Sequence, residues 1–335
     1  MGRSGLLAAL TLGLGACTLI NSTAEFGDPE DGGRDSGPRV DGGDAGDPSD
    51  AAPFDAGPAP PAPTLLFPWN GYMTGSVHAD TSLRPHLMWN SSPGSDRYEI
   101  EVSSGCEVRL RDTCAFPSAI AAETTDTEWR PVAALEVSTS TPVGQRYYWR
   151  VRACVGLACS VWSAVRYLDV GRLGDDYNAD GYSDLLVGAP RETVFDSPLQ
   201  GRAYVFLSTG TDFASAPSAT LQPPPMATGT FGASVASLGD VNGDGYSDAA
   251  IGSSVDTGAV FVFHGGPSGL SAIASTTLPG PHSDAQFGWS LAAVGDMDGD
   301  GFDDLLVGAR NEDTSSSQAG RTRIYRGSSE GIVSS

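Results

Sequence analysis

Three acidic loops place oxygen-bearing side chains at one recurring spacing. The segment GDMDGDGFDDLLVGAR, Gly295 to Arg310, has aspartates at alternating positions, then a glycine and a further aspartate before an apolar run. Segments Asp175 to Pro190 and Gly239 to Ser254 align with it without a gap in the loop. Calcium takes six to eight oxygens, commonly from carboxylates, an amide, a backbone carbonyl and water. The spacing therefore predicts three calcium sites.

Each loop offers side chains at positions 1, 3, 5 and 9 and a backbone carbonyl at position 7, while glycine at position 6 allows a sharp turn. An EF-hand closes instead with a glutamate at position 12 between helices, whereas these loops run into apolar strands. Asp-Gly pairs that only make turns are the alternative, and magnesium is the weaker candidate because it prefers a stricter octahedron. The predicted ligands are Asp176, Asn178, Asp180, Tyr182 and Asp184; Asp240, Asn242, Asp244, Tyr246 and Asp248; and Asp296, Asp298, Asp300, Phe302 and Asp304.

Each loop belongs to a longer repeat. A short apolar run follows the loop, and a second β run then starts at Gly201, Gly258 or Gly320. Phe231-Gly232 and Phe287-Gly288 open a strand before the second and third loops, but the first copy has no such pair. A recurring unit of several strands is typical of propeller blades.

These residues resemble the FG-GAP repeats of the integrin α-subunit β-propeller. The two Phe-Gly pairs match the first half of the motif and Gly188-Ala189-Pro190 the second, from which the later copies depart. The many Gly, Ser, Thr, Pro and Val residues also favour strands and turns over helices, so we predict an all-β protein. Propellers typically have four to eight blades, so residues 171–335 are predicted to form an incomplete propeller that needs further blades or association to close.

Residues 64–170 show the pattern of short strands. Alternating apolar residues predict a hairpin of His86 to Asn90 with Arg97 to Ser104. The segment resembles a fibronectin type III sandwich, with Trp89 as the early core tryptophan and Tyr147 at the tyrosine corner. A later strand is predicted to place on one face Tyr147, Trp149, Val151 and Ala153, and on the other Tyr148, Arg150 and Arg152.

Four of the five cysteines lie in this sandwich segment, which fits an exported protein. Cys106 and Cys114 bracket a short loop, and Cys154 and Cys159 flank a turn between strands. We predict these two local disulfides among the three pairings that are formally possible. A zinc site is the alternative, although the spacings are irregular and no histidine accompanies the cysteines.

The N-terminus has the features of an export signal. Arg3, the apolar run from Leu6 to Leu14 and the following Gly-Ala-Cys are similar to a bacterial lipoprotein signal over residues 1–17. By that resemblance Cys17 would carry the lipid and anchor the chain to a membrane; an ordinary secretory signal is the alternative. Residues 18–63, rich in Gly, Asp, Pro and Ala, are predicted to be a disordered acidic linker.

The formal net charge is -22, which argues against a nucleic-acid partner. Asp256-Thr257-Gly258 lacks a second aspartic-protease motif, and Ser234 and Ser290 lack the final glycine of a nucleophile elbow, so no enzymatic activity is expected. We expect a non-catalytic, calcium-binding adhesion or ligand-binding protein anchored in the cell envelope, at the outer membrane or cell surface. Its ligand would be a protein or carbohydrate. A targeting or scaffold subunit that positions a separate secreted or envelope enzyme is the alternative.

Overall fold

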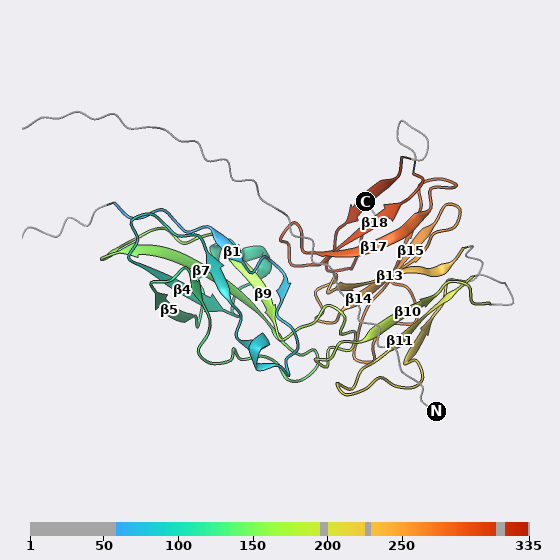
Figure 1. The fold of residues 1–335 in the computed structure, drawn as a ribbon, viewed down its shortest axis with the longest axis horizontal. Helices are drawn as coiled ribbons and strands as arrows, with labels where there is room; N and C mark the ends of the chain where they lie inside the picture. The colour runs from blue at the N-terminus through green and yellow to red at the C-terminus, as the bar shows by residue number, and fades with distance from the viewer. Residues whose placement is uncertain (1–57, 195–199, 225–228, 313–318, 334–335) are drawn as a thin grey trace, which may run out of the picture. The chain divides into compact units, whose positions relative to one another are not determined.

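The computed structural model describes residues 58–194, 200–224, 229–312 and 319–333, and there the protein is all-β (Figure 1). Two short 3-10 helices, η1 (Asp80–Leu83) and η2 (Val108–Thr113), are the helices of these residues. Neither has the length and apolar character needed to cross a bilayer. The predicted signal with Cys17 and most of the predicted linker lie outside the described residues.

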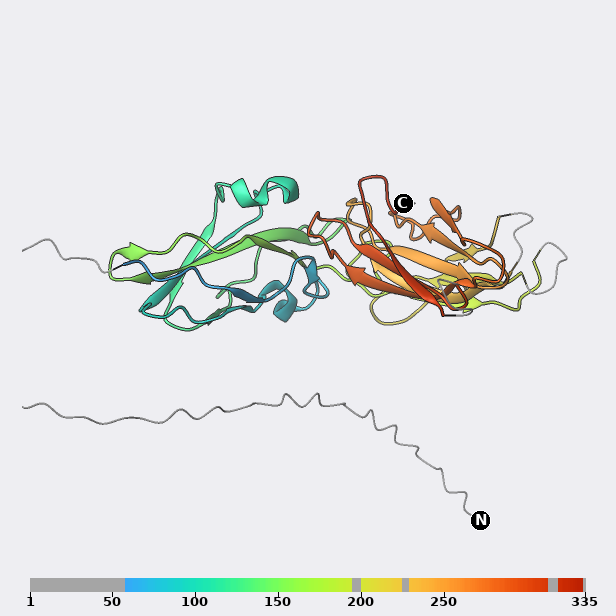
Figure 2. The same cartoon turned by 90° about the horizontal axis from the view of Figure 1, so that it is seen from above.

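The first part of the described chain is a two-sheet sandwich, drawn in blue to green in Figures 1 and 2. Its strands are β1 (Leu65–Phe67), β2 (Tyr72–Met73), β3 (Leu87–Trp89), β4 (Arg97–Ser103), β5 (Ile120–Thr124), β6 (Glu128–Trp129), β7 (Gln145–Val155), β8 (Ala158–Cys159) and β9 (Arg166–Val170). One sheet has the order β1-β3-β6, and the other has the order β2-β9-β7-β4-β5 with β8 paired to β7. Trp89 of the first sheet and Trp149 of the second share the core between them.

Strand β7 has the buried face that its alternation predicts. Tyr147, Trp149, Val151 and Ala153 are all buried, and the Tyr147 hydroxyl donates to the Glu136 carbonyl at 2.6 Å, as in a tyrosine corner. The opposite face is covered too, because Tyr148 packs in a second cluster with Phe116.

Both predicted disulfides are present. Cys154 and Cys159 are register partners on β7 and β8, and the Cys106–Cys114 bridge closes the loop that contains η2. With all four cysteines bridged, the alternative zinc site loses its thiolate ligands.

The predicted hairpin of β3 with β4 is wrong. Strand β3 pairs with β1 and β6, whereas β4 pairs with β5 and β7, so the two lie in different sheets. The Asn90 N–H donates to Thr64 O at 2.8 Å, next to the first sheet. The Asp96 N–H donates to Cys154 O, also at 2.8 Å, in the second. Alternation identifies a buried face, which both strands have, but it does not identify the pairing partner.

Each repeat forms one antiparallel sheet, and the three are drawn from yellow-green to red in Figure 1. The first consists of β10 (Leu185–Ala189), β11 (Arg202–Phe206) and β12 (Ala219–Leu221). The second consists of β13 (Phe231–Gly239), β14 (Asp248–Ser253), β15 (Ala259–Phe263) and β16 (Thr276–Pro279). The third consists of β17 (Phe287–Gly295), β18 (Asp304–Ala309) and β19 (Arg321–Tyr325). Strands that are consecutive in the chain are neighbours in each sheet, as in propeller blades.

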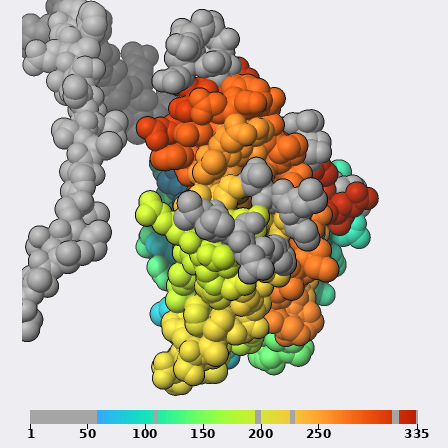
Figure 3. Space-filling view, turned by 90° about the vertical axis from the view of Figure 1, so that its right-hand side faces the viewer, coloured from blue at the N-terminus to red at the C-terminus, as the bar shows by residue number. Residues whose placement is uncertain are grey.

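Neighbouring sheets contact each other through β10, β13 and β17, and the surfaces of the repeats adjoin in Figure 3, yellow-green to red. The three sheets do not close into a ring within the described residues. The first sheet begins at β10 and lacks the inner strand that β13 and β17 provide in the other two. Leu185 and Val187 of β10 are 43% and 40% exposed, whereas their β18 counterparts Leu305 and Val307 are fully buried against the second sheet. The prediction of an incomplete propeller is confirmed.

Glycines allow neighbouring sheets to approach closely. A Cβ on Gly188 would meet the carbonyl oxygen of Gly232 at 2.1 Å, and a Cβ on Gly252 would meet that of Gly288 at 2.3 Å. The glycine that ends the apolar run of one repeat therefore faces the Phe-Gly glycine of the next. Both halves of the motif act at the same junction between sheets.

Candidate metal centres

Strand pairing closes each acidic loop at its base. In the second and third loops, the residue before position 1 pairs with position 9, Gly239 with Asp248 and Gly295 with Asp304. In the first loop, the Asp184 N–H donates to the carbonyl of residue 175 at 2.8 Å. Each loop thus brings its predicted ligands together in one turn. The chain continues directly from that turn into β10, β14 or β18.

The aspartate at position 1 organises each loop. Its carboxylate is buried in all three copies and accepts hydrogen bonds from the backbone N–H groups at positions 5 and 6. These bonds measure 3.0 and 2.7 Å at Asp176, 3.1 and 2.9 Å at Asp240, and 3.1 and 2.7 Å at Asp296. The chain is therefore wrapped around one carboxylate, with the side chains of positions 3 and 5 close by.

Those neighbouring side chains fit a cation. In the third loop, carboxylate oxygens of Asp296, Asp298 and Asp300 lie within 4.8 Å of one another. In the first loop, Asn178 donates its amide N–H to Asp180 at 2.9 Å, while its Oδ1 is buried without a hydrogen-bond partner among the described residues. A buried acceptor oxygen with no donor, beside carboxylates, is one that a metal ion or an ordered water would satisfy.

The aspartate at position 9 has a second role that the spacing does not reveal. One carboxylate oxygen accepts from the position 2 N–H, at 2.8, 2.9 and 3.0 Å in the three loops. The other accepts from an N–H that follows the next strand: Ser208 and Gly265 at 2.9 Å, and Gly327 at 3.0 Å. Asp184, Asp248 and Asp304 therefore tie each loop to the end of the next strand, which lies at the same edge of the sheet as the loop.

The rings at position 7 are half-buried in all three loops. Tyr182 stacks on His78 of the sandwich with ring centroids 4.2 Å apart. The ring of Phe302 lies close to Gly243 of the second loop. These rings fill the spaces between loops and neighbouring segments, and their backbone carbonyls remain the predicted ligands.

Burial raises the pKa of several loop carboxyls. It raises that of Asp176 to about 7, that of Asp240 to about 6 and that of Asp248 to about 8, and neighbouring aspartates add to each shift. Burial also raises the pKa of Asp184 to about 6 and, in the third loop, that of Asp300 and Asp304. A nearby positive charge favours the ionised form of such grouped, buried carboxylates. A divalent cation would provide that charge.

Position 8 links successive loops, a role that the ligand spacing does not predict. The Ser247 N–H donates to Asp176 O at 3.2 Å, and the Asp303 N–H donates to Asp240 O at 3.0 Å. The Asp303 carboxylate also accepts from the Asp240 N–H at 2.9 Å, and burial raises its pKa to about 8. In the sequence, the only sign of this role is the aspartate at position 8 of the third copy, where the other two copies have serine.

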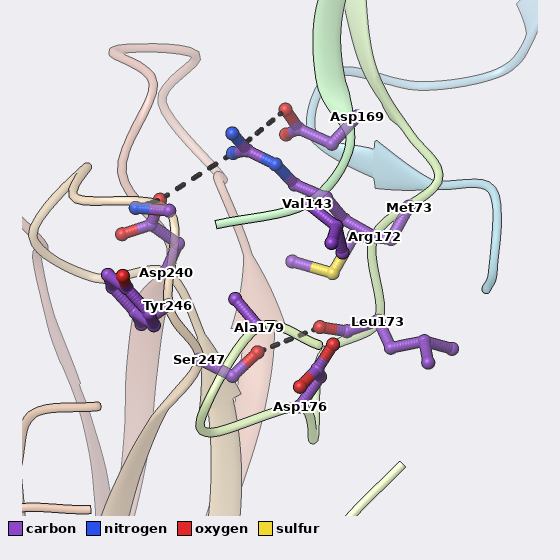
Figure 4. Close-up of a pocket in the computed structure, with 11 residues that line it drawn as sticks. Met73, Val143, Asp169, Arg172, Leu173, Asp176, Ala179, Asp240, Tyr246 and Ser247 are labelled. Atoms are coloured by element: carbon purple, nitrogen blue, oxygen red, sulfur yellow. Dashed lines mark hydrogen bonds and ion pairs between the residues drawn. The ribbon is translucent and has the colours of Figure 1, made fainter. Parts of the chain in front are cut away.

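Arginines of the sandwich and the segment after it approach the loops. Figure 4 shows the Arg172 guanidinium between Asp169 and Asp240, at 3.5 and 3.9 Å from their carboxylates. Arg146 forms a second ion pair with Asp169 at 2.8 Å. Arg172 thereby offsets part of the negative charge at the second loop.

Comparison with known proteins identifies the repeat. The family model described as FG-GAP repeat matches residues 172–206, 231–263 and 287–325, the same three units that the sheets define. The chain contains three FG-GAP repeats and is integrin α-like in this part.

Several integrin α subunits are similar to this FG-GAP protein. Integrin alpha-5 of Xenopus laevis is 40% identical over 169 residues, which cover 47% of this chain and 16% of the relative. Integrin alpha-PS3 of Drosophila melanogaster is 35% identical over 152 residues (43% and 14%). Human integrin alpha-7 is 41% identical over 136 residues (40% and 11%). The chain thus spans less than a fifth of the length of these relatives.

A solved structure titled "Structure of FN3tt mut" covers 33% of this FG-GAP protein and 92% of its own chain, at 17% identity and a TM-score of 0.21. That score is too low to support an argument about the fold. The fibronectin type III assignment of residues 64–170 stays a prediction, which the tyrosine-corner bond and the two-sheet topology favour.

Proposed function

We propose that this protein is a non-catalytic, surface-anchored, calcium-binding adhesion or ligand-binding protein. The observation that carries the proposal is the threefold recurrence of one loop geometry, in which backbone N–H groups hold a buried carboxylate beside further oxygen donors. In the proposed organisation, a lipid anchor and a linker precede a fibronectin type III-like sandwich over residues 64–170 and the repeats over 171–335. FG-GAP repeats and integrin α similarity support the adhesion role.

Calcium would be held by the oxygens at positions 1, 3, 5, 7 and 9 of each loop. The unpartnered Oδ1 of Asn178 and the raised carboxyl pKa values support a cation there. Calcium is preferred over magnesium because the loops mix carboxylate, amide and carbonyl oxygens, which suits an adaptable coordination sphere.

Equilibrium dialysis of the purified chain tests the metal proposal. We expect three bound calcium ions per chain, two after Asp180→Ala and weaker binding of magnesium. Asp126→Ala, which alters an exposed turn aspartate outside the repeats, is the matched control and should leave three. If the unmodified protein binds no calcium, the metal proposal is wrong and the Asp-Gly pairs only make turns.

Anchoring is proposed from Cys17 and tested separately. Cys17→Ser should release the chain from membranes or leave the signal uncleaved. Unchanged membrane fractionation together with unchanged mobility would exclude the lipid anchor and leave the secretory alternative.

The class of ligand separates adhesion from scaffolding. We expect the protein, captured with bound material from the native envelope, to retain carbohydrate or foreign cell-surface molecules. One stoichiometric envelope enzyme would instead favour the targeting or scaffold role.

We also propose that the repeats close by adding blades or by association. The exposed Leu185 and Val187 on one terminal sheet, and Trp289 and Ile324 at 47% and 48% exposure on the other, support this proposal. Light scattering should show assembly beyond the monomer. A stable, compact monomer would contradict it.

A further inference from the structure

The sandwich contacts the first and third acidic loops directly. At the first loop, the Val143 N–H donates to Ala179 O at 3.1 Å, and the Ser76 hydroxyl donates to Gly181 O at 2.5 Å. A ring nitrogen of His78 lies 3.1 Å from Asp180 O. These contacts reach backbone carbonyls of the loop and leave the position 1 carboxylate, that of Asp176, to the loop's own N–H groups.

The third loop differs because the sandwich reaches a predicted ligand itself. The Tyr167 hydroxyl of β9 donates to the Asp296 carboxylate, on the same oxygen that accepts from the Gly301 N–H. Both side chains are buried, with Tyr167 fully so. A buried neutral donor therefore holds the position 1 carboxylate from the side of the sandwich.

Two arginines of the sandwich hold the backbone of the same loop. Arg146 of β7 donates to Gly301 O at 2.9 Å, and its guanidinium lies 4.4 Å from the centre of the Tyr167 ring. Arg111 of η2 donates to Gly299 O. Three side chains from three separate elements thus converge on the segment from Asp296 to Gly301.

Neither of the other two position 1 aspartates receives such a bond among the described residues. The hydrogen bonds that Asp176 and Asp240 accept come from their own loops, and Arg172 lies 3.9 Å from Asp240 as a longer-range charge. The difference is specific to the third copy.

We propose that the third cation site is composite, with Tyr167 as a positioning residue for Asp296, so that cation binding and docking of the sandwich on this loop are coupled. This inference rests on the proposed calcium function. Groups that hydrogen-bond a ligand fix its orientation, and their loss commonly weakens metal binding 10- to 100-fold. Binding equilibria are coupled reciprocally. If docking of the sandwich raises the affinity for the cation by some factor, the bound cation favours docking by the same factor.

Tyr167→Phe tests the proposal because it removes the hydroxyl and keeps the ring. Calcium titration calorimetry on the full chain should show one of three sites weakened about tenfold and two unchanged. Tyr148→Phe is the matched control, since Tyr148 is the register partner of Tyr167 and packs in the same cluster. It should leave all three sites unchanged. Arg111→Ala, acting from η2, should weaken the same single site.

The same substitution in a chain that lacks the third site tests whether the weakened calcium site is the third loop. In an Asp300→Ala chain, which lacks that site, Tyr167→Phe should alter neither remaining affinity. A change in one of them would overturn the assignment.

Hydrogen exchange reports the docking independently of affinity. In the unmodified chain, chelator should speed amide exchange in β9, and Tyr167→Phe should reduce that response. If three ions bind and Tyr167→Phe leaves every affinity and the exchange response unchanged, the composite site is wrong while the calcium function stands. If no ion binds to the unmodified chain, the calcium function itself fails.

Discussion

Gly188→Ala tests how neighbouring repeats are held together. A Cβ at this position would meet the Gly232 carbonyl oxygen at 2.1 Å and two further Gly232 backbone atoms at 3.0 and 3.3 Å. Ordinary contact starts near 3.4 Å, so the first and second sheets must separate locally by about 1 Å. Overpacking of this kind costs about 1–3 kcal/mol. A loss of about 2 kcal/mol corresponds to a fall of roughly 4–8 °C in melting temperature.

Gly308→Ala is the matched control. Gly308 occupies the same strand position in the third repeat, but its Cβ would meet the Ser290 hydroxyl oxygen at 2.3 Å and further atoms only at 3.6 and 3.7 Å. The serine side chain can rotate, and no following sheet lies there in the described residues. We expect a change within about 1 kcal/mol, since alanine also lowers the entropy of the unfolded chain.

Both variants should be melted with calcium present, with circular dichroism as the signal and hydrogen exchange in β13 as a local measure. Gly188→Ala should lower the melting temperature and speed exchange in β13, whereas Gly308→Ala should do neither. Equal destabilisation by both would show that the cost arises within a strand and not at the junction, and would refute the reasoning.

Three further predictions concern the cation sites, the ion pairs of Asp169 and the hydrogen bond of Tyr147. Chelator should lower the melting temperature and calcium restore it, with magnesium clearly weaker, since an ion at a hundredfold its Kd stabilises by about 2.7 kcal/mol; indifference to chelator would contradict this. Although burial opposes it, the charges of Arg146 and Arg172 hold the pKa of Asp169 below its ordinary value. The contribution of Asp169 to the free energy of unfolding is therefore complete above about pH 4 and lost at lower pH. In urea unfolding, the destabilisation caused by Asp169→Asn should shrink on acidification rather than stay constant. Tyr147→Phe should cost about 1 kcal/mol in unfolding free energy by removing the bond to Glu136 O; an unchanged urea midpoint would argue against the tyrosine corner.

The sequence by itself determined the features that depend on short spacings. Donor atoms at alternating positions around a glycine specify one turn, so the three acidic loops are identifiable within about ten residues each. The buried face of β7 and both disulfides are equally local, since side chains alternate along a strand and each cysteine pair flanks a short loop. Threefold repetition identified the blade.

Only the tertiary structure decided which distant segments meet. Alternation could not show that β3 and β4 enter different sheets, because either pairing buries the same side chains. The loop spacing likewise could not reveal that the Asp304 carboxylate binds the N–H of Gly327, or that Asp296 meets Tyr167 from another part of the chain. Such partners depend on how strands and sheets pack. The local sequence around a carboxylate does not indicate which distant donor will lie beside it.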